Sequence, residues 1–322
     1  MDALAALAAP DMARVDALIL ERMASDVPVI PQLAEHLVAA GGKRMRPLIT
    51  LAAARMLGDD VSAAVKLAAA VEFIHTATLL HDDIVDQSDM RRGKVAAHLI
   101  WGSASSVLVG DFLFARAFEL MVETGNLAAL GSLARASRVI AEGEVLQLSR
   151  ARDPDLDEPT YIQIISAKTA ELFAAAAESG AIGAGGGAGQ VDALRNFGLH
   201  LGLAFQLADD ALDYGGLSET LGKNAGDDFR EGKVTLPLLL AMARTRGRED
   251  AFWQRVIARR EQGEGDFTRA RELIIGTGAL AATLERAGEH ADQARAALSR
   301  FDDGPWLRAL SDLADFAVTR AS

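Results

Sequence analysis

Apolar residues recur along the chain with the spacing of helices, and strict alternation of apolar and polar residues is nearly absent. Together with the predominance of alanine and leucine, this pattern favours a helical protein with a large core. Glycines, prolines and aspartates punctuate the pattern where helices would stop and start. The predicted helices cover residues 11–24, 29–40, 46–57, 61–86, 103–124, 127–150, 158–182, 190–214, 234–245, 249–262, 267–275, 279–299 and 304–319.

The glycine-rich stretch GAIGAGGGAG, residues 180–189, is open to a second interpretation. Gly183, Gly185 and Ala188 fit the loosest form of the G-x-G-x-x-A loop that binds dinucleotides. That loop follows a strand, whereas this stretch follows a predicted helix, so we interpret it as a turn between two helices. No change of composition marks a linker, although the length alone would suggest about two domains. We therefore expect a single all-α domain over residues 1–322.

The composition excludes several classes of protein. A formal charge of −12 is the opposite of the basic footprint that nucleic-acid binding requires, so we expect no nucleic-acid partner. The absence of cysteine excludes a disulfide framework and fits a reducing compartment. The N-terminus carries acids and no basic n-region, so we do not predict a signal peptide. The most apolar segment, 61–80, contains Lys66, Glu72 and His75, and we therefore expect a cytoplasmic protein without stable membrane insertion.

Two acidic clusters interrupt helices that otherwise look buried. LLHDDIVDQSDMRRG, residues 79–93, and LADDALD, residues 207–213, both contain the spacing D-D-x-x-D. Residues four apart are neighbours on a helix, so the first and last aspartate of each cluster share a face, where repulsion costs about 0.2–0.5 kcal/mol. The aspartates are Asp82, Asp83 and Asp86 in the first cluster and Asp209, Asp210 and Asp213 in the second.

A solvated acidic face is the plain interpretation of these clusters. Apolar residues between the aspartates, such as Ile84 and Leu212, nevertheless give each helix a side to bury. Burying like charges costs far more than their repulsion in water unless a cation pairs with them. Magnesium fits such acids, because it takes one or two carboxylates and fills its other positions with water and phosphate. If both clusters serve one site, the chain between them must fold as a single unit.

Positive charges stand near both clusters and at one predicted helix start. GGKRMRPLIT places Lys43, Arg44 and Arg46 ahead of Pro47, where each cation opposes the helix dipole by about 0.3–1 kcal/mol. A bound anion would reverse this penalty, although a solvated basic turn is the simpler alternative. Acids that bind magnesium beside spaced cations predict a site for a diphosphate. The further cations are Arg91, Arg92, Lys168, Lys223 and Lys233.

These stretches together resemble the trans-isoprenyl diphosphate synthases. The marks are GGKRMRP, LLHDDIVDQSDMRRG, KTAELF, FQLADDALDY and GKNAGDDFREGKVTLPL, which follow one another in family order over residues 41–240. The chain is most similar to the long-chain bacterial polyprenyl diphosphate synthases of the octaprenyl or decaprenyl type, which make quinone tails. The resemblance implies a homodimer in which each subunit is one helical bundle around a deep central cavity, the isoprenoid synthase fold.

The resemblance also implies substrates, cofactor and site residues. The substrates would be isopentenyl diphosphate and an allylic diphosphate of the farnesyl or geranyl type, with two or three magnesium ions in each active site. Magnesium would be bound by Asp82, Asp86 and Asp209, with Asp83, Asp210 and Asp213 supporting the cluster. Isopentenyl diphosphate would be held by Lys43, Arg46, His75 and Arg92. The allylic diphosphate would be held by Arg91, Lys168, Thr169, Gln206, Lys223 and Lys233.

The length of the product is expected to depend on residues before the first cluster. In this family, side chains one turn ahead of these aspartates form a floor for the growing chain. Ala77 and Thr78 occupy those positions and are small, so we expect a long product and deeper stops at Phe73, Phe114 or Phe118. Replacing Ala77 with phenylalanine should shorten the product to farnesyl or geranylgeranyl length.

The sequence departs from the family pattern in one place. His98, Leu99 and Trp101 stand where small or amide residues are expected, which affects the local cavity wall and the product length rather than the reaction. Two other functions are compatible with a related fold. A class I terpene cyclase would usually carry an Asn/Ser/Glu triad in place of the second cluster and would lack GGKRxRP. A non-enzymatic partner subunit would carry degenerate clusters.

Overall fold

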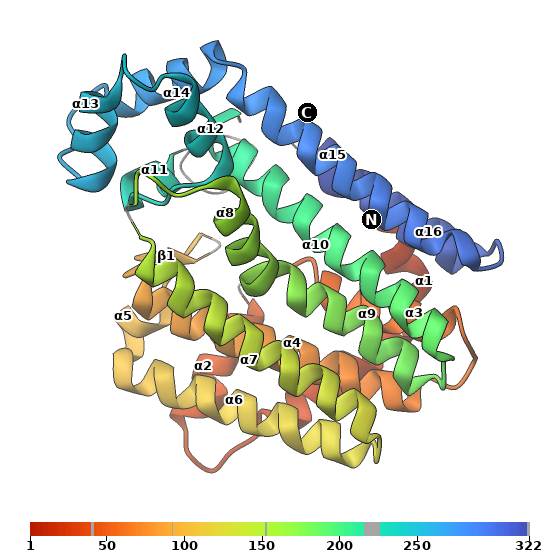
Figure 1. The fold of residues 1–322 in the computed structure, drawn as a ribbon. Coiled ribbons are helices and arrows are strands. Elements are labelled where there is room, and N and C mark those ends of the chain that lie inside the picture. The colour runs from red at the N-terminus through yellow and green to blue at the C-terminus, as the bar shows by residue number, and fades with distance from the viewer. Residues whose placement is uncertain (40–41, 92, 152, 216–225, 321–322) are drawn as a thin grey trace. The chain divides into compact units, whose positions relative to one another are not determined.

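The computed structural model describes residues 1–39, 42–91, 93–151, 153–215 and 226–320, which Figure 1 colours in chain order. The secondary structure of this part of the chain is helical, apart from one antiparallel pairing of β1 (Met90–Arg91) with β2 (Lys94–Val95). The prediction of an all-α protein is therefore confirmed. The chain groups into two compact units, one around each acidic cluster, and the expectation of a single domain stays a prediction.

The first unit comprises residues 1–137, 172–198 and 297–313. Its helices are α1 (Asp2–Arg22), α2 (Val29–Ala39), α3 (Met45–Arg55), α4 (Ser62–Val85), α5 (Ala97–Trp101), α6 (Ser103–Glu123) and nearly all of α9 (Glu171–Gly183). α4 contacts α1, α3, α5 and α6, and it is therefore the central helix of this unit (Figure 1).

α4 is central because its sequence is apolar around most of its circumference, as in helices that are buried on all sides. The whole run from Ala68 to Ile74 is buried. α4 is also long and apolar enough to cross a membrane, but 61% of its most apolar window is buried inside the structure. It is a core helix, and its C-terminal end carries the first acidic cluster.

The second unit comprises residues 138–171, 199–296 and 314–322. Its core contains Tyr161, Leu207, Tyr214, Phe229 and Trp253. Its own helices are α8 (Glu158–Ile165), the π-helical turn η1 (Ser166–Ala170), α11 (Asp227–Glu231), α12 (Leu236–Arg244), α13 (Asp250–Trp253), the π-helical turn η3 (Gln254–Ala258) and α14 (Asp266–Gly276). The helices that contribute residues to both units are α7 (Leu127–Ser149), α10 (Ala188–Gly215), α15 (Ala279–Ala297) and α16 (Pro305–Thr319).

Most predicted helices are found within a few residues of their expected ends. The glycine-rich stretch is confirmed as a turn, because α9 ends at Gly183 and α10 begins at Ala188. The predicted start of the first helix at residue 11 is wrong, since α1 begins at Asp2 and contains Pro10. Proline removes one helical hydrogen bond, but burial of Leu4 and Ala8 holds this turn in place.

Short elements escaped the prediction. α5 and α11 have five residues each and β1 and β2 have two, too few for a periodic pattern to develop. The single helix predicted over 158–182 is divided into α8, η1 and α9. A π-helical turn holds an extra residue and is often found at functional sites, and η1 contains Lys168.

Candidate active site

The first acidic cluster ends α4, and burial separates its three aspartates. Asp83 is 2% exposed, whereas Asp82 and Asp86 are half-buried. His75 and Thr78 are half-buried as well, and their spacing of seven and four residues places them on the same helix face as Asp82. One face of α4 therefore presents an imidazole, a hydroxyl and two accessible carboxylates.

Arg91 compensates the charge of the buried Asp83. Its guanidinium donates to Asp83 Oδ1 from Nε at 2.8 Å and from Nη2. Arg91 belongs to β1, so the hairpin that follows α4 brings this cation back onto the cluster. A buried carboxylate without such a partner would be strongly destabilising. The adjacent Arg92, assigned to isopentenyl diphosphate, lies outside the described residues.

Arg46 and His75, which were assigned to the same substrate, lie together in the first unit. Arg46 Nη1 donates to His75 Nε2 at 3.1 Å, and the guanidinium stacks 4.4 Å from the centre of the Phe173 ring. Lys43 is exposed. The first turn of α3 is therefore anchored to α4 through the contact of Arg46 with His75, which lies two helical turns before Asp82.

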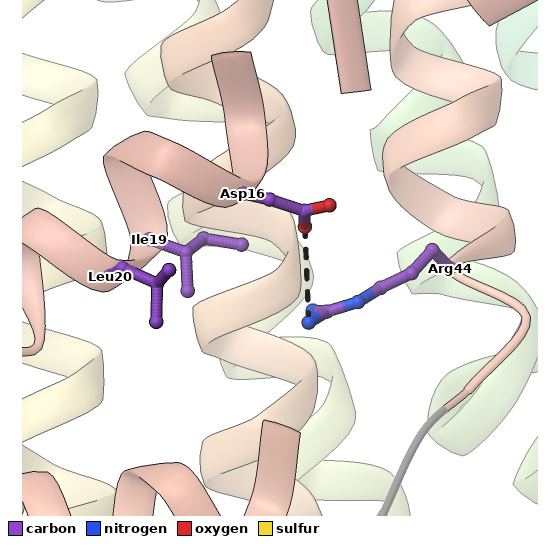
Figure 2. A pocket seen from close by; sticks show the side chains of 4 residues that line it. All are labelled: Asp16, Ile19, Leu20 and Arg44. Atoms are coloured by element: carbon purple, nitrogen blue, oxygen red, sulfur yellow. Dashed lines mark ion pairs between the residues drawn. The ribbon is translucent and has the colours of Figure 1, made fainter. Parts of the chain in front are cut away.

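Arg44, from the same basic turn, has acidic partners. Its guanidinium donates to Glu72 at 2.7 Å and lies 4.0 Å from Asp16. Figure 2 shows Arg44 beside a pocket of about 210 Å³ that is also lined by Asp16, Ile19 and Leu20. Because both acids already compensate Arg44, this pocket offers no net positive charge to a phosphate. We therefore do not place a substrate in it.

The second acidic cluster lies near the C-terminal end of α10, where each aspartate has different partners. The Asp209 side chain is 41% exposed and pairs with Arg320 at 3.3 Å. Asp210 is 3% exposed and accepts hydrogen bonds from the Tyr161 hydroxyl and from Gln206 Nε2, the latter at 2.7 Å. Thus the accessible carboxylate has a cationic partner and the buried one has neutral donors.

Asp213 is held by backbone N–H groups at the start of α11. Its carboxylate accepts from Gly226 at 3.1 Å, Asp227 at 3.2 Å and Asp228 at 3.2 Å. Gly226 has a φ of +85°, and a Cβ there would collide with the Phe267 ring, so this position requires glycine. The segment GDDF thus folds around a carboxylate of α10.

Burial changes the protonation of the second cluster. Burial and, to a smaller extent, the charges of Asp209 and Asp213 raise the pKa of Asp210 to about 7, against the opposite effect of the donors Tyr161 and Gln206. Burial also raises the pKa of Asp213, against the effect of its three N–H donors. Burial raises the pKa of Tyr161 far above its usual value, so its hydroxyl stays a donor. Near neutral pH the cluster therefore carries fewer than three negative charges.

Lys168 and Thr169 are positioned by the π-helical turn η1. A Cβ on Gly143 of α7 would lie 2.7 Å from Ala167 Cβ, so the two backbones approach closely only because residue 143 is glycine. Lys168 Nζ pairs with Glu144 at 2.8 Å, next to this contact. The close packing of the two backbones fixes the position of the Lys168 side chain relative to α7.

A chain of hydrogen bonds links η1 to the second cluster. Thr169 Oγ1 donates to Gln206 Oε1 at 2.9 Å, and the amide of Gln206 donates onward to Asp210. Thr169 and Gln206, both assigned to the allylic diphosphate, are thus brought together with an aspartate. Lys233 pairs with Glu231 at 2.6 Å, just after α11. Lys223 lies outside the described residues.

Two residues in contact with the cluster were missed by the sequence analysis. Tyr161 looks like a core aromatic, although its spacing of seven residues from Lys168 is a weak signal that both lie on one side of a helix. Arg320 lies more than 100 positions from its partner Asp209, and no motif surrounds it. Only the folded chain reveals it.

The donor atoms of the clusters suit a hard cation. Asp82, Asp86 and Asp209, the predicted ligands, supply oxygen and keep accessible surface. Across the part of the chain that the structure describes, no three His, Asp or Glu residues are gathered into a ready-made metal site. Magnesium combines few carboxylates with water and phosphate, and the oxygen donors of the three aspartates are of the kind that it takes. That both clusters border one cavity stays a prediction.

Known proteins resemble this chain over its whole length. A family model described as polyprenyl synthetase matches residues 27–274. The octaprenyl diphosphate synthase of Escherichia coli (strain K12) is 50% identical over 316 residues, 98% of this chain and 97% of its own. A crystal structure of polyprenyl synthase from Caulobacter crescentus CB15, complexed with calcium and isoprenyl diphosphate, is 68% identical, with a TM-score of 0.96 over 100% of this chain and 98% of that one. A decaprenyl diphosphate synthase structure from Rhodobacter capsulatus is 52% identical, with a TM-score of 0.96 over 100% and 99%.

The raised pKa of Asp210 predicts a pH-dependent stability of the metal-free protein. Between about pH 4 and pH 7 the folded protein keeps a proton that the unfolded chain has lost, so the free energy of unfolding should fall as the pH rises. In Asp210→Asn this fall should be absent. Its free energy of unfolding, relative to that of the wild type, should therefore rise by roughly 2–4 kcal/mol from pH 5 to pH 8. Urea unfolding in EDTA at both pH values measures the difference.

Asp266→Asn is the matched control. The pKa of Asp266 is lowered to about 2 by Arg255, so this residue is ionised in both states between pH 5 and pH 8. Its replacement should shift the two unfolding free energies by equal amounts. If the free energies of unfolding of the wild type and of Asp210→Asn change in parallel with pH, the assignment of a raised pKa to Asp210 is contradicted.

Proposed function

The chain belongs to the polyprenyl synthetase family, and we propose that it lengthens an allylic diphosphate by repeated addition of isopentenyl diphosphate. Its similarity to octaprenyl and decaprenyl diphosphate synthases identifies it as a prenyltransferase that makes long-chain polyprenyl diphosphates. One observation carries the assignment to this site. Both aspartate clusters are complete, and each keeps accessible carboxylates while its buried members are paired with donors.

The reaction joins two diphosphates in each cycle. The C–O bond of the allylic diphosphate breaks, and the pyrophosphate leaves with the bonding electrons. The double bond of isopentenyl diphosphate attacks the resulting allylic cation and forms a C–C bond. Loss of a proton to the departing pyrophosphate then gives an allylic diphosphate that is one isopentenyl unit longer, so the chain needs to supply no base.

The residues of the chain would bind and orient the two diphosphates. Magnesium at Asp82, Asp86 and Asp209 would stabilise the charge that develops on the leaving pyrophosphate. Lys168 would add positive charge to the allylic site, and its anchoring on η1 supports this role. The contact of Arg46 with His75 supports a second anion site for isopentenyl diphosphate, to which Lys43 and Arg92 would contribute.

Arg91 and Gln206 have a further role beside the allylic diphosphate. Arg91 holds Asp83, and Gln206 holds Asp210 while accepting from Thr169. In these positions they fix the supporting aspartates. Arg91 and Gln206 would therefore contact the substrate as well as an aspartate. Binding of the allylic diphosphate would in this way be coupled to the positions of Asp83 and Asp210.

The activity is tested by incubating the purified protein with magnesium, isopentenyl diphosphate and farnesyl diphosphate, followed by chromatography of the products. We expect long-chain products and their loss in EDTA. Asp82→Ala and Asp209→Ala should each lower kcat by at least about 10²-fold, because they remove charge stabilisation of the leaving group. Asp303→Ala, an exposed acid outside both clusters, should leave kcat unchanged.

Other outcomes of this assay favour the rival functions. Cyclic hydrocarbons released from farnesyl diphosphate alone would indicate a terpene cyclase. A complete lack of elongation by the purified protein would favour a subunit that needs an active partner. Wild-type kcat in both aspartate variants would contradict the proposed metal ligands.

Burial distinguishes the residues that are expected to set product length. Thr78 is half-buried on the face of α4 that carries Asp82, whereas Ala77 and Phe73 are buried. Phe118 is 41% exposed, and Phe114 stacks on His81 with ring centres 6.1 Å apart. We therefore place the first constriction at Thr78 and Ala77, and a deeper stop at Phe73.

Thr78→Phe and Ala77→Phe should both shorten the product to farnesyl or geranylgeranyl length, because an aromatic ring would close the path of the growing chain. Ala77→Phe should also lower the free energy of unfolding by about 1–3 kcal/mol, since the ring must displace packed neighbours. Thr78→Val is the control of conserved size and should keep the long product. An unchanged chain length in both phenylalanine variants would defeat this proposal.

We also infer a homodimer that uses the outer face of α6. Leu108, Phe118 and Val122 are 66%, 41% and 63% exposed, and their spacing places them along one stripe of the helix. Apolar patches of this kind usually mark an interface. Two exposed acids, Asp111 and Glu119, lie on this side of α6, and Glu119 is paired with Arg116. The stripe therefore carries little net charge, which suits contact with a second copy.

Sedimentation of the wild type should give a dimer mass, and the double variant Leu108→Glu and Val122→Glu should sediment as a monomer because like charges would meet across the interface. Ile275→Glu, at a residue that is 50% exposed on α14, is the control and should leave the dimer intact. A dimeric double variant would exclude this face as the interface.

We assign the reaction to the cytoplasm. The one helix of the described residues that is long and apolar enough for a membrane, α4, is mostly buried, and its C-terminal end carries acids that need water and charged substrates. Fractionation of cells should recover the protein with the cytosolic enzymes, whereas recovery only with washed membranes would contradict this assignment.

A further inference from the structure

Arg320, the residue that follows α16, is tightly held although only two residues follow it in the sequence. Its side chain is 13% exposed. The guanidinium stacks 3.7 Å from the centre of the Phe205 ring, donates from Nη2 to the Phe205 carbonyl at 2.7 Å and donates from Nε to the Ala317 carbonyl at 3.2 Å. Chain ends usually fray unless contacts of this kind hold them.

The remaining side of the guanidinium meets the second acidic cluster. Arg320 Nη1 lies 3.3 Å from Asp209 Oδ1, and the Asp209 side chain keeps 41% of its surface. The cation therefore contacts the carboxylate from the protein side and leaves the accessible side uncovered. Arg320, Asp209, Phe205 and Ala317 all belong to the second unit.

An arginine in this arrangement can orient a metal ligand. Carboxylates that bind metals are themselves hydrogen-bonded by residues behind them, and loss of such a partner typically costs 10–100-fold in metal affinity. A guanidinium is planar and always charged, so two carbonyl contacts and one ring contact fix both its position and its direction. Because three contacts hold the guanidinium of Arg320, we expect it to stay in place when a metal binds to Asp209.

We propose that Arg320 is a positioning residue for metal binding, which holds Asp209 in the orientation that accepts magnesium. The inference rests on the proposed function, in which Asp209 is a magnesium ligand. It makes the residue that follows α16 part of the active site, through a contact with the metal ligand Asp209 and without contact with the reacting atoms.

The experiment measures the binding of Mn²⁺ by electron paramagnetic resonance, in the presence of farnesyl S-thiolodiphosphate, which does not turn over. Arg320→Met should weaken the Mn²⁺ affinity by about 10–100-fold. Arg320→Lys keeps the charge and loses the forked geometry, so an intermediate affinity is expected. In the Asp209→Asn background, Arg320→Met should cause no further loss, because both residues act on one ligand.

Arg286→Met is the matched control. Arg286 pairs with Glu158 on α8, and both side chains are about one third exposed. Its loss removes an arginine–carboxylate pair of the same unit without touching Asp209, so Mn²⁺ affinity should stay at the wild-type value. Circular dichroism and urea unfolding of every variant separate lost binding from lost folding; if Arg320→Met does not fold, the affinity of Arg320→Lys decides.

Two results would overturn the inference and are distinguishable. Wild-type or higher Mn²⁺ affinity in the folded Arg320 variants, together with weakened binding by Asp209→Asn, would show that Arg320 only packs or competes with the metal. Wild-type affinity in Asp209→Asn would remove Asp209 from the metal ligands, and the proposed metal site would fall together with the inference.

Discussion

The compensation of six aspartates on two largely buried helices is the constraint on which the rest of the structure depends. Neighbouring carboxylates cannot be buried as bare charges, and the buried Asp83 and Asp210 and the half-buried Asp213 each have partners of their own. Asp83 has Arg91, Asp210 has the neutral donors Tyr161 and Gln206, and Asp213 has the N–H groups of residues 226–228. Asp82, Asp86 and Asp209 keep accessible surface, and we expect a metal to use these carboxylates, so that folding and chemistry would depend on different members of each cluster.

Most of the helices could be predicted from sequence, whereas the division of the aspartates into metal ligands and supporting residues stays a prediction. Long apolar periodicities fix helices such as α4 and α10, because burial of a continuous face dominates their energy. The spacing D-D-x-x-D, together with the resemblance, assigned Asp83 and Asp210 to supporting roles, and both are nearly inaccessible. The resemblance assigned Arg46 and His75 to the same substrate, and the two side chains are in contact.

The rest depends on contacts between distant segments. Arg320 meets Asp209, and Tyr161 meets Asp210, through packing that no local pattern encodes. The two-residue strands and five-residue helices are shorter than the period from which a helix or strand is recognised. The predicted start of α1 was wrong because Pro10 disfavours a helix locally, whereas burial of the first two turns against the core stabilises it.

The π-helical turn η1 carries Lys168 and Thr169, and both of their contacts depend on how this turn is wound. Its wider winding takes up one residue more than a regular helical turn would. Deleting any single residue between Ser166 and Ala170 would restore ordinary helical winding and keep both flanking helices intact. It would also remove the widened turn from which Lys168 and Thr169 project, so a change that is silent in helix content would separate Thr169 from Gln206 and Lys168 from Glu144. The number of residues in this turn therefore matters to the second cluster independently of their side chains.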